Sequence, residues 1–212
     1  MSSNVRDNKA FVCDLNLNYK PVYNIISRVF DIFSSLFFLI LSLPIVLIAA
    51  VAIKLEDGGS VFYNQIRTGK DGENFKIYKM RSMKINSCDT GNVVTEVNDI
   101  RITKVGKVIR ITRIDEIPQL LNVLKGEMKF IGPRPLVPEQ IEEYSKELPQ
   151  FKNRLAIKPG LTGLAQISGG NDLTPEEKLI LDVEYISHRG LILDFKIMAK
   201  TIAVVLSGEG AR

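Results

Sequence analysis

The stretch IFSSLFFLILSLPIVLIAAVAI, residues 32–53, contains no charged side chain. As an ideal helix it would rise about 33 Å, close to the thickness of the hydrocarbon core of a bilayer. Pro44 lies inside the stretch, where proline removes a backbone hydrogen bond and kinks a helix. A serine such as Ser42 can bond to carbonyls that are freed at a kink. The stretch therefore predicts a membrane helix with a break near Ser42 and Pro44.

Basic residues flank this stretch on both sides, which bears on its topology. Those that precede it are Arg6, Lys9, Lys20 and Arg28, and those that follow are Lys54, Arg67, Lys70, Lys76 and Lys79. Lysine and arginine are enriched on cytoplasmic flanks, so this bias does not choose a side for either end. Two topologies stay open from the residues alone: a simple spanning helix, and a re-entrant helix that enters and leaves on the cytoplasmic face. A cleaved signal peptide is disfavoured, because the apolar run is too long.

Length and composition set the organisation of the chain. The 212 residues have room for one modest domain and a membrane element, which we place at 55–212 and 1–54. The net charge of +4 suits phosphates or anionic lipid. Nucleic acid is disfavoured because no zinc knuckle, RNA-recognition signature or helix-turn-helix pattern is evident. Cys13 and Cys88 are isolated, which favours a reducing compartment. The single histidine, His188, is interpreted as a surface or interfacial residue without a catalytic role.

The remainder of the sequence predicts an α+β fold that is mostly helical. Alternating residues at 61–65 and 75–83, separated by a Gly-rich turn at 69–72, indicate a small β-hairpin. Residues 86–98 and 158–164 are expected to be loops. Helices are expected at 100–113, 117–124, 139–148, 175–186 and 193–206. The first and last of these are amphipathic, so they are either ordinary surface or core helices or interfacial helices that rest on the bilayer.

Two adjacent carboxylates, Asp115 and Glu116, stand where the helix at 117–124 should begin. The common role of such residues is helix capping. A helix N-terminus can also keep a carboxylate ionised and attract phosphate, so Asp115 could act as a nucleophile. Glu116 could then hold Mg²⁺, which prefers carboxylate and phosphate oxygens. Arg110, Arg113 and Arg134 could neutralise a transferring phosphoryl group; these residue types together suit phosphoryl transfer.

From about Lys20 to its C-terminus, the chain closely resembles the bacterial sugar transferases, the monotopic phosphoglycosyl transferases. The motifs that carry the resemblance are VFYNQ at 61–65, FKIYKMRSM at 75–83, DEIPQL at 115–120, NVLKG at 122–126, GPRP at 132–135, KPGLTG at 158–163 and DFKI at 194–197. Each motif alone is weak, but their order along one short chain is highly specific. The chain departs from the family pattern at Leu43, where a serine often precedes the membrane proline, and at Arg113, where a serine is common.

The resemblance implies transfer of a sugar 1-phosphate from a UDP-sugar, with an N-acetylated amino sugar favoured by family habit, to undecaprenyl phosphate with release of UMP. It implies that Asp115 is the nucleophile, that Glu116 binds Mg²⁺, and that the membrane helix is re-entrant with its break at Ser42 and Pro44. The residues that we expect to bind the substrate phosphates or the nucleotide are Lys79, Arg81, Arg110, Arg134 and Asp194. The implied location is the cytoplasmic face of the bacterial inner membrane, in contact with lipid, and a homo-oligomer is compatible with it.

Two alternatives to this hypothesis remain. The first is a catalytically silent scaffold that uses the same basic face to hold lipid or a partner at the membrane surface. The intact pair of Asp115 and Glu116 argues against it. The second is the same reaction through a ternary complex of the two substrates, without a covalent intermediate.

Overall fold

The computed structural model describes residues 20–84 and 99–207. Helices predominate, and the strands form two small sheets. The α-helices are α2 (Pro21–Asp57), α3 (Lys104–Ile111), α4 (Leu120–Lys125), α5 (Pro138–Glu147), α6 (Leu164–Ile167), α7 (Pro175–His188) and α8 (Leu191–Ser207). The strands are β1 (Phe62–Thr68), β2 (Asn74–Met80), β3 (Lys129–Ile131) and β4 (Gly160–Thr162). The 3₁₀ helices are η1 (Lys70–Gly72), η3 (Ile114–Gln119), η4 (Pro149–Ala156) and η5 (Gly170–Asp172).

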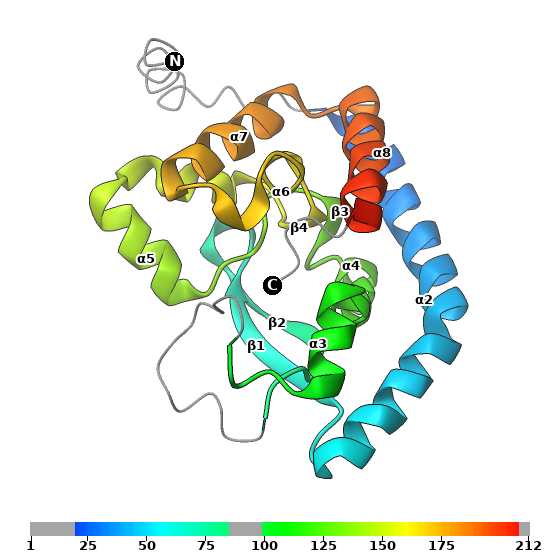
Figure 1. The fold of residues 1–212 in the computed structure, drawn as a ribbon. Coiled ribbons are helices and arrows are strands. Elements are labelled where there is room, and N and C mark those ends of the chain that lie inside the picture. Colours follow the sequence, from blue (N-terminus) through cyan, green and yellow to red (C-terminus); the bar gives the residue numbers. More distant parts are fainter. Residues whose placement is uncertain (1–19, 85–98, 208–212) are drawn as a thin grey trace.

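Helix α2 is the longest element and, within the described residues, the helix long and apolar enough to cross a membrane. Its 37 residues correspond to about 55 Å of ideal helix. It is continuous through Pro44, and the Ser42 hydroxyl donates to the Leu39 carbonyl at 3.3 Å. The helix curves along one side of the molecule (Figure 1). The structure thus shows the predicted helix but no interruption at Pro44, and a re-entrant course stays a prediction.

The first half of α2 is attached to the rest of the protein by a polar stripe. Four buried residues recur at every fourth position: Tyr23, Ser27, Asp31 and Ser35. Asp31 accepts a hydrogen bond from the Phe130 amide at 3.1 Å. Arg28 donates to the Val123 and Leu124 carbonyls at 2.6 and 2.7 Å, at the end of α4, where carbonyls lack helical partners.

The last turns of α2 are attached to the same body. Ala49 and Ile53 pack against Met80 of β2 and Ile109 of α3. The Glu56 carboxylate accepts from the Lys104 amide at 2.7 Å, at the start of α3. The large apolar side chains between the two attachments are mostly exposed, so α2 contacts the body at both ends and leaves its apolar middle largely uncovered.

The β-hairpin is confirmed. Strands β1 and β2 pair antiparallel, with Tyr63 opposite Lys79 and Arg67 opposite Phe75. Asp71 and Gly72 turn the chain in left-handed backbone conformations at φ 56° and 84°. Strand β2 ends at Met80, earlier than the predicted residue 83, because the chain there turns away to form a bridge to Ile102.

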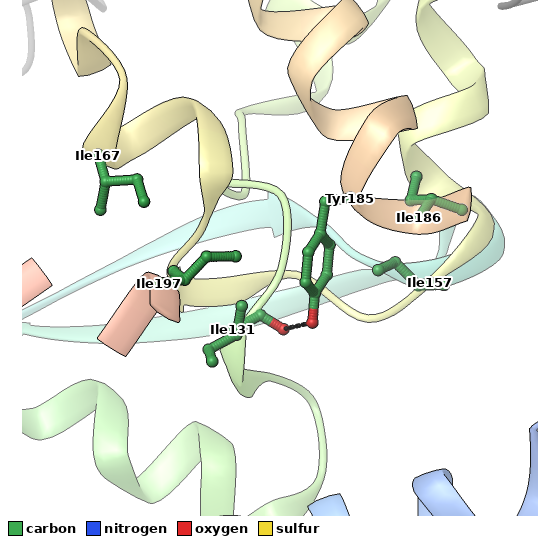
Figure 2. Packing of buried hydrophobic residues seen from close by; sticks show 6 residues of the cluster. All are labelled: Ile131, Ile157, Ile167, Tyr185, Ile186 and Ile197. Atoms are coloured by element: carbon green, nitrogen blue, oxygen red, sulfur yellow. Dashed lines mark hydrogen bonds between the residues drawn. The ribbon is translucent and has the colours of Figure 1, made fainter. Parts of the chain in front are cut away.

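The core of the body lies between the short parallel pair β3–β4 and helices α6, α7 and α8. Figure 2 shows Tyr185 among five isoleucines, with its hydroxyl oxygen 3.4 Å from the Ile131 carbonyl oxygen. A second cluster joins α5, η4 and α7 through Ile141, Phe151, Leu179 and Val183. Thr174 and Glu177 form a capping box at the start of α7.

Most predicted helices are confirmed, and three segments differ from the prediction. The helix expected at 100–113 is α3, which covers only Lys104–Ile111. The segment expected to be one α-helix at 117–124 begins with η3, and α4 follows it; Asp115 therefore lies inside η3, whose N-cap is Arg113. The segment 158–164 was predicted to be a loop, but it contains β4, whose hydrogen bonds come from the distant β3. His188 is exposed, as predicted. The predicted loop at 86–98 lies outside the described residues.

Candidate active site

The carboxylate pair is presented by a strained turn. Arg113, between α3 and η3, has a left-handed backbone at φ 59°, which is uncommon for a residue other than glycine. Such a conformation costs on the order of 1–3 kcal/mol and tends to occur at functional sites. The turn places Asp115 and Glu116 in the first turn of η3, which packs on β2.

Glu116 is held by two cations. Its Oε1 accepts from Arg134 Nη2 at 2.6 Å and from Lys79 Nζ at 3.3 Å. Burial alone would raise the pKa of Glu116, but Arg134 and Lys79 outweigh burial and hold this pKa well below its usual range. Glu116 is therefore ionised at neutral pH, as a carboxylate ligand of a divalent cation must be.

Asp115 has a different environment from its neighbour. Asp115 is 8% exposed. Within residues 20–84 and 99–207, its carboxylate accepts no hydrogen bond. Burial and then the charge of Glu116 raise the pKa of Asp115 to about 6, while Lys79, Arg110 and Arg134 act in the opposite direction. The pKa is therefore raised by burial, yet it stays below neutral pH, in line with the expectation that this carboxylate is ionised. At neutral pH it is still mostly ionised, and it is poorly solvated, which suits a nucleophile.

The cationic side of the site contains a residue that the sequence reasoning did not single out for binding. Arg67 of β1 donates to Gln65 Oε1 at 2.7 Å and to the Pro135 carbonyl at 3.4 Å. Burial and then the charge of Arg134 lower the pKa of Arg67 to about 10. The two-residue period of a strand, which places Tyr63, Gln65 and Arg67 on one face, was the available signal in the sequence, and their burial agrees with it.

The predicted binding residues separate into two groups. Lys79, Arg110 and Arg134 all act electrostatically on the carboxylate pair, and Arg110 also donates to Ser82 Oγ at 3.4 Å. Arg81 instead pairs with Asp57 at the end of α2. Asp194 accepts from the hydroxyl groups of Tyr23 and Tyr185 at 2.8 and 2.9 Å. These two residues join α2 to the body in the structure, and their role in substrate binding stays a prediction.

An apolar groove of about 340 Å³ adjoins the carboxylate pair. Its lining comes from α2 (Phe38, Leu41, Ser42 and Ile45) and from the body (Ile117, Leu120 and Phe130). Ile117, the residue that follows Glu116 in η3, is the part of this lining nearest in sequence to the carboxylate pair. Ser42, predicted at the helix break, lies in this lining.

These features define a protein with a long apolar helix, as in membrane proteins, and with a buried carboxylate pair that is surrounded by cations. Residues 22–208 match the model of the family described as "Bacterial sugar transferase", and the chain belongs to this family. The resemblance read from the motifs is confirmed.

Three relatives show how the match extends. The UDP-N-acetylgalactosamine-undecaprenyl-phosphate N-acetylgalactosaminephosphotransferase of Aeromonas hydrophila is 42% identical over 195 residues, which are 91% of this chain and 46% of the relative. The uncharacterized sugar transferase EpsL of Bacillus subtilis is 39% identical over 88% of this chain and 90% of its own length. The UDP-glucose:undecaprenyl-phosphate glucose-1-phosphate transferase of Caulobacter vibrioides is 38% identical over 87% of this chain and 71% of its own length. The chain thus spans about half of the first relative and most of the second.

Proposed function

We propose that this protein transfers a sugar 1-phosphate from a UDP-sugar to undecaprenyl phosphate and releases UMP, as an early membrane step of bacterial glycan assembly. Family membership and the names of the relatives support this reaction class. The observation that carries the proposal is a buried carboxylate, Asp115, that lies beside a cation-held Glu116 and next to an apolar groove. A charged donor and a lipid acceptor need these two surfaces side by side.

The first step is a displacement at phosphorus. An oxygen of the Asp115 carboxylate attacks the phosphorus that bears the sugar, and the bond from this phosphorus to the bridging oxygen breaks. The electron pair of that bond leaves with UMP, so a phosphosugar is joined to Asp115 as an acyl phosphate. Lys79, Arg110 and Arg134 lie where they can neutralise charge on the transferring group, which is the main contribution a protein makes to phosphoryl transfer.

The second step returns the carboxylate. A phosphate oxygen of undecaprenyl phosphate attacks the same phosphorus, the bond to Asp115 breaks, and the product is an undecaprenyl diphosphate sugar. The prenyl chain of this acceptor suits the groove between α2 and the body, whose lining is apolar except for Ser42. Placed there, the lipid phosphate would reach the carboxylate pair from the membrane side.

Magnesium is proposed as the cofactor. No cluster of three or more carboxylate, histidine or cysteine residues exists in the part of the chain that the structure describes. Mg²⁺ often binds through one or two carboxylates with water and substrate phosphates, so Glu116 fits such a site. Both cations that hold Glu116 contact its Oε1, so Oε2 is the oxygen suited to the metal. When bound, Mg²⁺ would neutralise charge on the donor diphosphate.

The attachment of α2 favours a re-entrant course on one face of the membrane. Both ends of the helix bind the same body, through Arg28 and Asp31 at one end and through Ile53 and Glu56 at the other. A helix that crossed the bilayer could not leave both ends on one side. Exposed apolar residues of α8, including Ile192, Phe195 and Ile202, support an interfacial position for that helix. The basic flanks favour the cytoplasmic face.

A panel of UDP-sugars tests the proposal. UMP release should require undecaprenyl phosphate for turnover and Mg²⁺, and an N-acetylated amino sugar is the first candidate because of the Aeromonas relative's name. The glucose-1-phosphate transferase of Caulobacter shows why other sugars belong in the panel. The Asp115→Asn variant serves as the control for contaminating activity. Absence of UMP release with every sugar, together with binding to anionic vesicles, would support a non-catalytic membrane scaffold instead.

A further inference from the structure

The loop that carries Arg134 is fixed at every backbone carbonyl. Pro133 and Pro135 restrict the backbone on either side of Arg134. Five consecutive carbonyls each accept a hydrogen bond: Gly132 from Gln166 Nε2 at 3.3 Å, Pro133 from the Gly160 amide at 2.9 Å, Arg134 from Arg154 Nη2 at 3.0 Å, Pro135 from Arg67 Nη1 at 3.4 Å, and Leu136 from the Thr68 amide at 2.9 Å. This loop is therefore rigid through contacts with four separate parts of the chain.

The bond to the Arg134 carbonyl comes from a buried ion pair. Arg154 in η4 is 3% exposed, and its Nε and Nη2 lie 3.0 and 2.7 Å from Oδ2 of Asp182 in α7. The guanidinium also lies over the ring of Phe151, 4.9 Å from its centroid. Two polar contacts and one ring contact thus hold this guanidinium in one orientation.

Fold stability alone is a weak explanation for this pair. Replacing a buried ion pair by well-packed apolar residues is often neutral or stabilising, because both charges lose their hydration. The surroundings of the ion pair are apolar. Phe151, whose ring contacts the guanidinium, and Val183, which follows Asp182 in the sequence, belong to one hydrophobic cluster. A directed hydrogen bond to the Arg134 backbone is what an apolar pair could not supply.

We propose that Arg154, oriented by Asp182, is a positioning residue that fixes the Arg134 backbone and thereby aims the Arg134 guanidinium at Glu116 and at the donor phosphate. The proposal rests on the proposed function of the site. Arg154 is nearly fully buried and bonds to Asp182 and the Arg134 carbonyl, so it acts through Arg134. A displacement of about 1 Å at a reacting group can lower a rate by roughly a hundredfold, so small changes at this bond should be measurable.

The test is a double-mutant cycle between Arg154→Lys and Arg134→Lys. Lysine keeps a positive charge for Asp182 but lacks the planar fork that binds the carboxylate and the carbonyl together. Arg154→Lys alone should lower kcat/KM for UMP release roughly tenfold and weaken UDP binding measured by calorimetry. In the Arg134→Lys background the same change should have little further effect, because its target is already altered.

Thr174→Ala is the matched control for stability. It removes the cap of α7, the helix that carries Asp182, without touching the Arg134 loop. It should lower the melting temperature but keep kcat/KM and UDP affinity near those of the wild type. If Arg154→Lys lost no more activity than Thr174→Ala, or if its effect were fully additive with Arg134→Lys, the positioning role would be overturned.

A second variant keeps the test open if Arg154→Lys does not fold. Gln166→Leu removes the donor to the neighbouring Gly132 carbonyl without leaving a buried charge. It should produce a smaller, few-fold loss that is also absent in the Arg134→Lys background, and no loss at all would contradict the proposal. A wild-type protein that neither releases UMP nor binds UDP would refute the proposed function itself, an outcome distinct from an active enzyme with additive variants.

Discussion

Replacing Asp115 by asparagine should abolish turnover and at the same time stabilise the fold. Asp115 is 8% exposed and its carboxylate accepts no hydrogen bond from the described residues, and burial together with the charge of Glu116 outweighs the three nearby cations. Asparagine has nearly the same shape and carries no charge. An amide oxygen cannot form the acyl phosphate, so activity should fall by at least about a thousandfold.

The size of the stabilisation follows from the pKa of Asp115. Burial and the charge of Glu116 raise this pKa from 3.8 to about 6. At about 1.4 kcal/mol for each pH unit, ionised Asp115 lowers the free energy of unfolding by up to about 3 kcal/mol. Between these two pKa values the folded protein keeps a proton that the unfolded chain has lost. Stability therefore falls as pH rises through this interval, and the whole loss is present above pH 6.

Far-UV circular dichroism in detergent or nanodiscs can measure this effect. Near neutral pH the Asp115→Asn variant should melt on the order of 5–10 °C above the wild type, and the difference should shrink towards pH 4 as the wild-type carboxyl becomes protonated. The activity of the wild type should fall with an acid limb near pH 6. An asparagine variant that is no more stable at neutral pH, or whose advantage does not depend on pH, would refute this reasoning.

Three further predictions follow from the same site. Glu116→Gln, in contrast to Asp115→Asn, should destabilise the fold at neutral pH by about 1–2 kcal/mol, because Lys79 and the partly screened Arg134 lose their counter-ion. A melting curve that shows a stabilised variant would contradict this prediction. Arg134→Lys should lower kcat/KM roughly a hundredfold at a nearly unchanged melting temperature, and unchanged kinetics would remove Arg134 from the site. Cysteines introduced at Val5 and Ser60 should both be protected from an impermeant reagent added to intact cells, whereas labelling of either from outside would exclude the re-entrant course.

The sequence was most informative where the pattern is local. The apolar run inside α2, the hairpin and the helices α5, α7 and α8 all follow from periodicity, capping and turn residues that lie within a few positions of one another. The carboxylate pair and the Gly-Pro-Arg-Pro loop were also identified, because few residue types suit phosphoryl transfer. The structure adds that Arg134 and Lys79 meet at one oxygen of Glu116.

The features that the sequence did not reveal depend on distant partners. Strand β4 has three residues and exists because β3 lies beside it. The polar stripe of α2, which includes Ser27 and Asp31, lies mostly before the apolar run. Its residues are buried only because the rest of the protein folds against this part of the helix. The raised pKa of Asp115 could not be read from the sequence, because it depends on burial and on the position of Glu116 relative to three cations. Arg67 was identified only as one of the basic residues that follow the apolar run. Its contact with the Pro135 carbonyl depends on the path of the loop that carries Arg134.

The covalent intermediate on Asp115 is the central claim, and intact-protein mass spectrometry tests it most directly. Wild-type protein is incubated with Mg²⁺ and the active UDP-sugar, without undecaprenyl phosphate. It should release up to one equivalent of UMP and gain the mass of one phosphosugar, which should be absent from Asp115→Asn and should disappear when undecaprenyl phosphate is added. No adduct and no burst of UMP, while turnover with both substrates stays fast, would contradict the covalent route and leave the ternary-complex mechanism in its place.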